Sequence, residues 1–503
     1  MFHSDTHIEL TQPYRPPPEG GKTFTRSQIQ ASIAVSMGSM IVGYSSAWSS
    51  PAIASLMEPG REIKVTSNEA SWIGSLMPLA ALIGGFIGGS LLEALGRKKT
   101  ILSTAIPFIV AGLIVSFAQD VYMIYAGRAI TGFCIGIISL SLPVYLAETI
   151  SPEVRGTLGL LPTSIGNAGV MLCYIFGFWL DWSYLSLIGA IIPLPFLFMV
   201  CTIPETPRFL VANNKATAAR ASLQWLRGSH ADITAELNEI EAMNILALKS
   251  KFKIKELFKM TYMKPLFVSM GLMFFQQFSG INAVLFYSVS IFESAGSSID
   301  SNLATIILGI VNICATIFSN VLIDRLGRKI LLYISLIGMI GSLGVFGAYF
   351  YMRNSEILQL SGIIPLVALV VYIISFSVGF GPIPWLMMGE IFPARIRGPA
   401  ASLSTAFNWT CTFVVTKTFM DLQIVLGQSG VFWLFAGILI ISCFFVIFFV
   451  PETRGKTLED IERLYIERRM SIIMDGGDAP PPIQSYRRVS SIANLKSTPS
   501  QFL

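Results

Sequence analysis

The stretch Gly89-Ser-Leu-Leu-Glu-Ala-Leu-Gly-Arg-Lys98 occurs again later in the chain as Asn320-Val-Leu-Ile-Asp-Arg-Leu-Gly-Arg-Lys329. In both copies an apolar run leads to an acid, then a glycine, then two cations. Cations that directly follow an apolar run are retained at the surface of a membrane. Each copy therefore marks a helix end, at the same point in two related parts of the chain.

Two further motifs repeat in the same order. Glu148 stands seven residues before Arg155, as Glu390 stands seven before Arg397. The triplet at residues 204–206, Pro-Glu-Thr, recurs at residues 451–453. Three matches in one order indicate that the chain consists of duplicated halves.

The segments between these motifs are strongly apolar. Apolar runs begin near residues 29, 70, 100, 121, 157 and 182, and again near residues 265, 302, 330, 361, 398 and 430. A crossing of a hydrocarbon core about 30 Å thick takes about 20 apolar residues, so a dozen crossings would use about half of the 503 residues. Charged residues make up only 13% of the chain, against about 25% in soluble proteins, which excludes a water-soluble enzyme.

The sequence thus predicts an all-α polytopic membrane protein of twelve transmembrane helices in two six-helix halves. An even number of crossings per half relates the halves by a pseudo-twofold axis along the membrane normal, with a binding site expected between them near mid-membrane. The predicted division is a tail over 1–28, one half over 29–204, a helical linker over 205–264, the other half over 265–450 and a tail over 451–503.

The distribution of cations predicts the orientation. Loops 2/3, 4/5, 8/9 and 10/11 carry nine Lys or Arg, the linker carries ten more, and the opposite side carries four (Arg61, Lys64, Arg353 and Lys417). Cationic loops stay in the cytoplasm, so both tails and the linker are predicted to be cytoplasmic in a multi-pass protein of the plasma membrane.

Several classes of site are not supported. The six cysteines lie in apolar runs without paired spacing, which argues against a disulfide framework and a metal site. The three histidines lie in hydrophilic stretches, and the cations form no single basic surface for nucleic acid. We expect no cofactor, no metal, no nucleic-acid partner and no enzymatic activity.

The motifs resemble those of the sugar porter family of the major facilitator superfamily, over essentially the whole chain. The duplicated acid-x-x-Gly-Arg-Lys turn is typical of the superfamily, and Gln276-Gln277, Gly280-Ile281-Asn282 and Gly381-Pro-Ile-Pro-Trp385 are typical of sugar porters. More narrowly, Leu160-Leu-Pro-Thr163 and Ala406-Phe-Asn-Trp-Thr-Cys-Thr-Phe413 resemble the insect facilitated trehalose transporters. The resemblance implies alternating access by the two halves.

Physical chemistry independently favours a sugar as the substrate. An unmet buried hydroxyl costs about 1–3 kcal/mol, so a sugar pathway needs neutral groups that both donate and accept, as amides do. The amide candidates within apolar runs are Gln276, Gln277, Asn282, Asn312 and Asn408. Buried amides can instead tie membrane helices together, and that alternative stays open.

The resemblance adds two positions to the substrate site. Trp385 is similar to the family's sugar-stacking tryptophan, although interfacial packing is the alternative for an isolated indole. Thr163 stands where glucose carriers have a glutamine, and Ser377 where they have a glutamate. Shorter side chains leave volume, which favours a disaccharide.

Coupling to protons is not expected. Proton-coupled sugar porters have an Asp in the first span where this chain has Ser45, and serine does not titrate. Arg128, an intramembrane cation in the fourth span, does not deprotonate, so carbonyls or tyrosine hydroxyls should hold it. The sequence predicts uniport down the substrate gradient.

Charged residues at helix ends are candidates for a cytoplasmic latch between the halves. The candidates are Arg97, Glu148 and Arg155 in one half, Arg328, Glu390 and Arg397 in the other, and by resemblance Glu205 and Glu452. Pairs across the interface would favour the outward-open state. The alternative is that residues 97–99 only determine topology. Phe286 and Tyr287 resemble the family's outer gate, with ordinary aromatic packing as the alternative.

The predicted function is therefore facilitated transport of a sugar across the lipid bilayer, most specifically of trehalose. A hexose facilitator is the main alternative, followed by a proton-coupled symporter. The tail carries Arg487-Arg-Val-Ser490, in which Ser490 fits a basophilic kinase site, so such a kinase is an expected partner.

Overall fold

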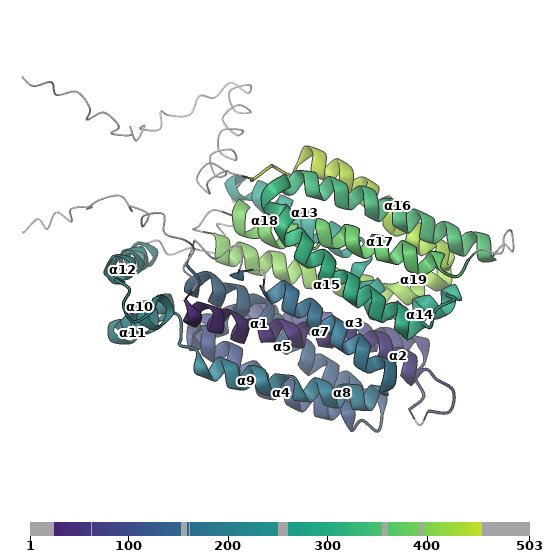
Figure 1. The fold of residues 1–503 in the computed structure, drawn as a ribbon, viewed down its shortest axis with the longest axis horizontal. Coiled ribbons are helices and arrows are strands. Elements are labelled where there is room, and N and C mark those ends of the chain that lie inside the picture. The colour runs from purple at the N-terminus through teal and green to yellow at the C-terminus, as the bar shows by residue number, and fades with distance from the viewer. Residues whose placement is uncertain are drawn as a thin grey trace, which may run out of the picture.

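The computed structural model describes residues 25–61, 63–151, 158–159, 161–249, 260–354, 361–392 and 396–454. Over these ranges the chain forms helices and no strand. Most of the helices run side by side along one direction (Figure 1).

In the first half the structure describes eight helical segments. They are α1 (Arg26–Ala47), α2 (Ser49–Leu56), α3 (Ser67–Leu95), α4 (Arg97–Ser116), α5 (Val121–Thr149), α7 (Leu161–Trp179), α8 (Trp182–Ile191) and α9 (Pro193–Thr202). α3 begins with a capping box, in which Thr66 and Glu69 satisfy each other's backbone N–H groups. Ile192, which joins α8 to α9, has helical dihedral angles, so the two form one crossing, Trp182–Thr202.

The second half follows the same plan. Its helices are α13 (Met260–Gln277), α14 (Ile281–Ala295), α15 (Ser301–Leu326), α16 (Arg328–Asn354), α17 (Ile364–Val378), α18 (Ile383–Ile391) and α19 (Arg397–Phe448). The 52 residues of α19 would span about 78 Å if straight, far more than a bilayer core. The chain breaks at Gly427, whose φ of 71° is outside the helical region, and α19 therefore contains two crossings.

The number of crossings matches the prediction. Ten segments of the described chain are long and apolar enough to span a membrane, and the last of them, Gly398–Phe448, holds two crossings. α1 packs along α7 and α5 and completes the twelve (Figure 1). The observed helix starts lie within five residues of those expected from the apolar runs.

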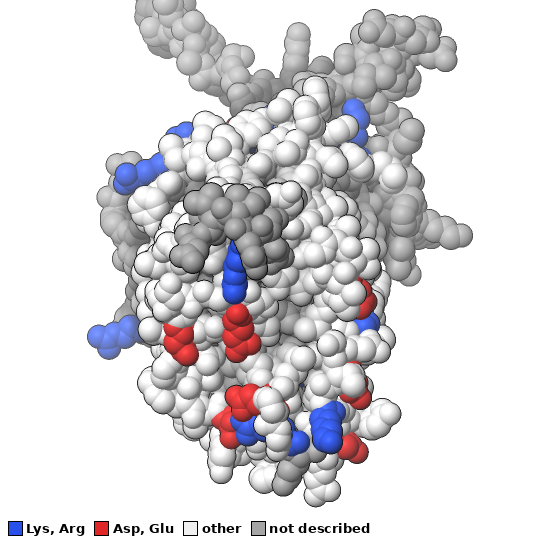
Figure 2. All heavy atoms as spheres, turned by 90° about the vertical axis from the view of Figure 1, so that its right-hand side faces the viewer, with Lys and Arg blue, Asp and Glu red and all other residues white. Residues whose placement is uncertain are grey.

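The two ends of the helix bundle differ. We call the end that carries Gly96 and Gly327 the basic end, and the end that carries α2 the distal end. At the basic end lie α10 (Pro207–Ala212), α11 (Ala216–Arg227) and α12 (Thr234–Lys249), shown at the left of Figure 1. Figure 2 looks onto the distal end, where charges of both signs are scattered over a mostly uncharged face.

Within the first half, α3 and α5 cross at backbone contact. A Cβ added to Gly132 would lie 2.1 Å from the carbonyl oxygen of Met77, and one added to Gly84 would lie 2.1 Å from that of Phe133. Neither helix could approach so closely with larger residues at these positions. A Cβ on Gly85, by contrast, would meet no atom within 4 Å.

This crossing gives a first testable prediction. The Gly132→Ala variant should lower the stability of the protein by about 1–3 kcal/mol, because the added methyl group forces two backbones apart. Thermal unfolding of the purified protein measures the loss. Gly85→Ala is the matched control and should leave the melting temperature unchanged. Equal melting temperatures for the two variants would contradict a tight crossing.

Candidate functional site

Two helices of the second half are interrupted, and the interruptions meet. α13 and α14 are separated by residues 278–280, where Gly280 has a φ of 90°. α17 and α18 are separated by residues 379–382. The Gln276 amide donates to the carbonyl oxygens of Phe380 (2.8 Å) and Gly381 (2.9 Å), which lie in the second interruption. Broken membrane helices of this kind commonly form substrate sites in transporters.

The predicted amides extend from this point as one hydrogen-bonded network. Asn408 on α19 donates to Gln276 Oε1 at 3.0 Å, and Gln277 donates to Asn408 Oδ1 at 3.0 Å. Asn282, which lies in the first turn of α14, donates to Gln277 Oε1. Gln276, Gln277 and Asn408 are at most 5% exposed. The structure thus brings together four of the seven predicted substrate residues.

The hydrogen bonds divide these amides into two kinds. Both N–H groups of Gln276 are taken by carbonyls, and those of Asn408 by Gln276 and by the Met273 sulfur at 3.3 Å. Gln277 and Asn282 each use one N–H within the described chain, which leaves each of them a donor. Gln276 and Asn408 therefore hold the network in place, while Gln277 and Asn282 retain capacity to bind a hydroxyl.

A second polar pair joins the two halves. Asn167 on α7 donates to Thr316 Oγ1 on α15 at 2.7 Å. One turn along each helix lie two predicted residues: Thr163, which is exposed, and Asn312, which accepts from Ser377 at 3.0 Å. Asn167 was not among the predicted site residues, although an amide one turn from Thr163 in an apolar span could have indicated it.

Trp385 lies on α18, directly after the interruption that Gln276 fills. Its side chain is half-buried, and no described aromatic ring stacks on it. The indole lies beside a broken helix and is partly accessible, so its face can stack on a sugar.

The repeated motifs at the basic end form two similar clusters. Glu205 Oε1 accepts from the backbone N–H groups of Arg97 (3.0 Å) and Lys98 (3.1 Å) at the start of α4. Glu452 accepts in the same way from Arg328 (3.1 Å) and Lys329 (2.9 Å) at the start of α16. Each glutamate caps the N-terminus of a helix that begins more than a hundred residues earlier.

The environment of Glu452 shows how firmly such a cap is held. Burial alone would raise the pKa of its carboxyl, but backbone N–H donors from Arg454, Lys329, Arg328 and Thr453 outweigh burial and lower that pKa. Because this pKa is lower in the folded than in the unfolded state, the carboxylate contributes stability at pH values above its unfolded-state pKa. That contribution is lost as the pH falls through the folded-state pKa.

The ion pairs of these clusters lie inside each half. Arg97 pairs with Glu148 at 2.7 Å, and Arg328 pairs with Glu390 at 2.8 Å. Both partners of each pair belong to helices of one half in this conformation. Pairs between the halves, expected when the basic end is closed, stay a prediction. Arg155 lies outside the described residues, as does the side chain of Arg397.

Besides the bond between Asn167 and Thr316, a group of bonds between the halves lies toward the distal end. Lys417 on α19 donates to Ser71 Oγ (2.6 Å) and Asn68 Oδ1 (3.1 Å) on α3, and its ammonium lies 4.8 Å from the ring of Trp72. The Val289 N–H donates to Ser50 Oγ at 3.0 Å. Lys417 was missed as a contact residue because its sequence context marks only a loop cation.

The two predicted outer-gate residues lie close to this contact. Tyr287 interrupts the helical dihedral angles of α14, donates to the Thr416 carbonyl at 3.2 Å and stacks on Phe419. Its hydroxyl lies 2.6 Å from the position of a Cβ on Gly74 of the other half. Phe286 is 1% exposed and belongs to the core.

Arg128 is held as expected by carbonyls, although not by tyrosine hydroxyls. It donates to the carbonyls of Ser45 (2.8 Å) and Ile73 (3.2 Å) and to Ser49 Oγ (2.8 Å). The Trp48 ring covers the guanidinium at 5.0 Å. Arg128 thus ties α5 to α1, α2 and α3 within the first half.

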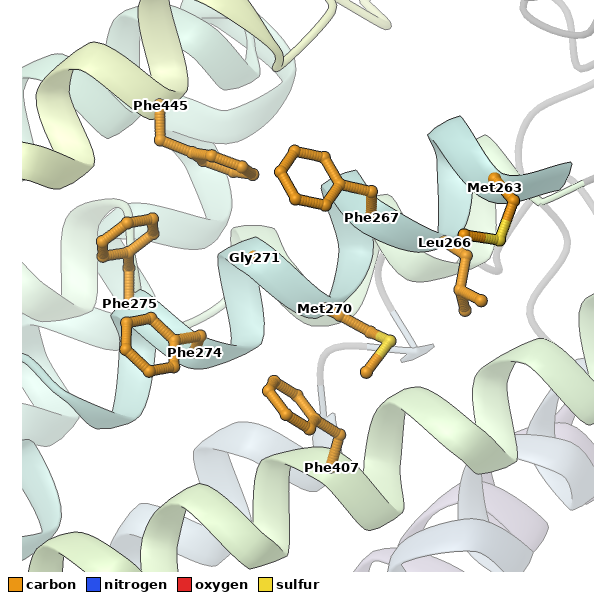
Figure 3. Close-up of a pocket in the computed structure, with 9 residues that line it drawn as sticks. All are labelled: Met263, Leu266, Phe267, Met270, Gly271, Phe274, Phe275, Phe407 and Phe445. Carbon is orange, nitrogen blue, oxygen red and sulfur yellow. The ribbon is translucent and has the colours of Figure 1, made fainter. Parts of the chain in front are cut away.

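An apolar groove lies beside the amide network. It has a volume of about 430 Å³, follows α13 and α19, and is lined by Met263, Leu266, Phe267, Met270, Gly271, Phe274, Phe275, Phe407 and Phe445 (Figure 3). The side chains around it are apolar, so it offers almost no partner for a hydroxyl. The amide network, which follows Phe275 on the same helix, has the chemistry that the groove lacks.

Comparison with known proteins agrees with this architecture. The family model described as "Sugar (and other) transporter" matches residues 31–465. The chain is 54% identical to the facilitated trehalose transporter Tret1 of Polypedilum vanderplanki, over 95% of this chain and 92% of that protein. It is 50% identical to the protein of the same name from Culex quinquefasciatus, over 99% and 93% of the two chains.

Solved structures show the same fold. The proton:xylose symporter XylE bound to 6-bromo-6-deoxy-D-glucose superimposes with a TM-score of 0.73 at 26% identity, over 87% of this chain and 99% of that chain. The inward-open conformation of XylE from E. coli gives a TM-score of 0.72 at 25% identity with the same coverage. The chain therefore belongs to the sugar transporter family of the major facilitator superfamily.

Proposed function

We propose that this protein is a facilitated transporter that carries trehalose across the plasma membrane by alternating access. The observation that carries the proposal is the amide network at the two helix interruptions, with unused donors on Gln277 and Asn282. Such groups replace the water bonds of a neutral polyhydroxylated solute. The choice of trehalose rests on the relatives named for it at 50–54% identity.

Uniport follows from the absence of a switchable acid. Ser45 occupies the position of the coupling acid, and its carbonyl accepts from Arg128. In the described part of the chain no carboxylate pairs with Arg128. Transport then requires only a substrate gradient, and no enzymatic step is part of it.

The basic end faces the cytoplasm in this proposal, together with both tails and the linker over 205–264. Residues 451–503 then form a cytoplasmic tail, in which Ser490 is a candidate kinase site that lies outside the described residues. The halves, over 29–204 and 265–450, move against each other about the interface.

The distal bonds make this the conformation in which the extracellular side is closed. The clusters at Arg97 and Arg328 keep each half rigid at the basic end. Glu148 Oε2 is buried and has no hydrogen-bond partner in the described chain, so it can accept from an arginine of the other half when the basic end closes. Arg397 is the cation of the other half suited to this contact, and Arg155 is its equivalent in the first half.

Uptake measurements test the substrate and the coupling. Cells that express the protein should take up labelled trehalose, and vesicles without an ion gradient should equilibrate it without accumulation. A protein that carries glucose and not trehalose would be a hexose facilitator. Accumulation driven by an imposed proton gradient would contradict uniport.

A further inference from the structure

A small cavity lies inside the first half, apart from the amide network. It has a volume of about 40 Å³ and is lined by residues of α1, α4, α5 and α8. A cavity needs about 10–15 Å³ to hold a particle the size of a water molecule. The space therefore admits a small ion or a few water molecules, and it is far too small for a sugar.

The charge beside this cavity is not balanced. Arg128 lines the cavity and is 3% exposed. Its partners, two carbonyls, the Ser49 hydroxyl and the Trp48 ring, are all neutral. The ion pairs of the described residues do not include it. A permanent charge inside a membrane protein is costly without a counter-charge.

The open polar groups of the cavity are hydrogen-bond donors. A guanidinium has five N–H groups, and the described bonds of Arg128 engage three, which leaves two. Ser45 and Thr131 also line the cavity, and within the described ranges neither hydroxyl makes a hydrogen bond.

The other two hydroxyls at the cavity are already committed as donors. Tyr44 donates to the Leu185 carbonyl at 2.8 Å, and Ser186 donates to that of Trp182 at 2.6 Å. They cannot serve as donors without breaking these bonds. The groups free to turn into the cavity are thus one cation and two hydroxyls.

We propose that this cavity binds a monovalent inorganic anion, which in the cell is chloride. Chloride accepts hydrogen bonds from any direction and supplies the single negative charge that Arg128 lacks. Arg128 and Thr131 would hold it from α5 and Ser45 from α1, so the bound ion ties these helices together. Binding therefore stabilises the first half as a rigid unit.

Thermal unfolding of the purified full chain tests this without any sugar. Replacing sodium gluconate by sodium chloride or bromide at constant ionic strength should raise the melting temperature in a saturable way. Crystals of the full chain grown in bromide should show anomalous density beside Arg128. Thr131→Val keeps the side-chain shape, removes one donor to a charged ligand, and should weaken the apparent chloride affinity about tenfold.

Two further variants decide between outcomes. Arg128→Gln should abolish the chloride dependence, whereas Thr410→Val, which removes a hydroxyl bonded to its own helix at Ala406, should preserve it. Equal melting temperatures in chloride and gluconate would show a cavity filled by water and would overturn the proposal. If chloride raises the melting temperatures of both Arg128→Gln and Thr131→Val as much as that of the unchanged protein, the ion binds elsewhere and the proposal is overturned.

Discussion

Replacing Gln277 by Ala is expected to lower sugar uptake by about tenfold while the protein still reaches the membrane. The change removes the donor to Asn408 and the acceptor for Asn282, so one buried and one partly buried amide lose a partner at once. It also removes the unused N–H that Gln277 offers to a substrate hydroxyl. Initial rates of labelled trehalose uptake, normalised to surface protein, measure the effect.

Two variants separate binding from folding in this experiment. Gln30→Ala removes an amide at the start of α1 that bonds Thr202 outside the site, and its uptake should remain normal. Gln276→Ala should instead reduce the amount of folded protein, because it leaves the carbonyls of Phe380 and Gly381 without their donor. Full uptake by Gln277→Ala would show that the amides only connect helices.

The same network shows what the sequence could predict. Apolar runs determine where membrane helices start, so twelve crossings followed from composition and length alone. The spacing of Gln276, Gln277 and Asn282 placed them within two turns, yet their contact with Asn408 on α19 depends on packing between helices distant in sequence. That contact could not be derived from spacing.

Which arginine pairs with which glutamate at the basic end was harder to predict. The repeats placed Arg97, Glu148 and Glu205 at one end of the bundle, and their equivalents at the same end of the other half. Sequence alone could not distinguish pairs within a half from pairs between halves, because both arrangements put the same charges at one surface. The capping of α4 by Glu205 depends on a chain path of more than a hundred residues.

The second large effect is expected at Lys417. Lys417→Met removes two hydrogen bonds from an ammonium to α3 and its contact with the Trp72 ring, which are bonds between the halves. Hydrogen bonds from a charged group contribute about 1.5–3 kcal/mol, so losing them should shift the population toward a distal-open state about tenfold. Unlike Gln277→Ala, this change leaves the amide network intact.

A cysteine at position 50 reports this shift. Ser50 is fully buried and accepts from the Val289 N–H across the interface, so a thiol there should react with a maleimide only when the distal end opens. In purified protein with Cys201 and Cys314, the exposed cysteines, changed to serine, Lys417→Met should speed labelling of Ser50→Cys about tenfold. Lys64→Met removes a distal cation that forms no described bond to the other half, and labelling should keep its parental rate. If both lysine variants label at that rate, the bonds of Lys417 do not hold the distal end closed, and the aromatic contact of Tyr287 with α3 must do so instead.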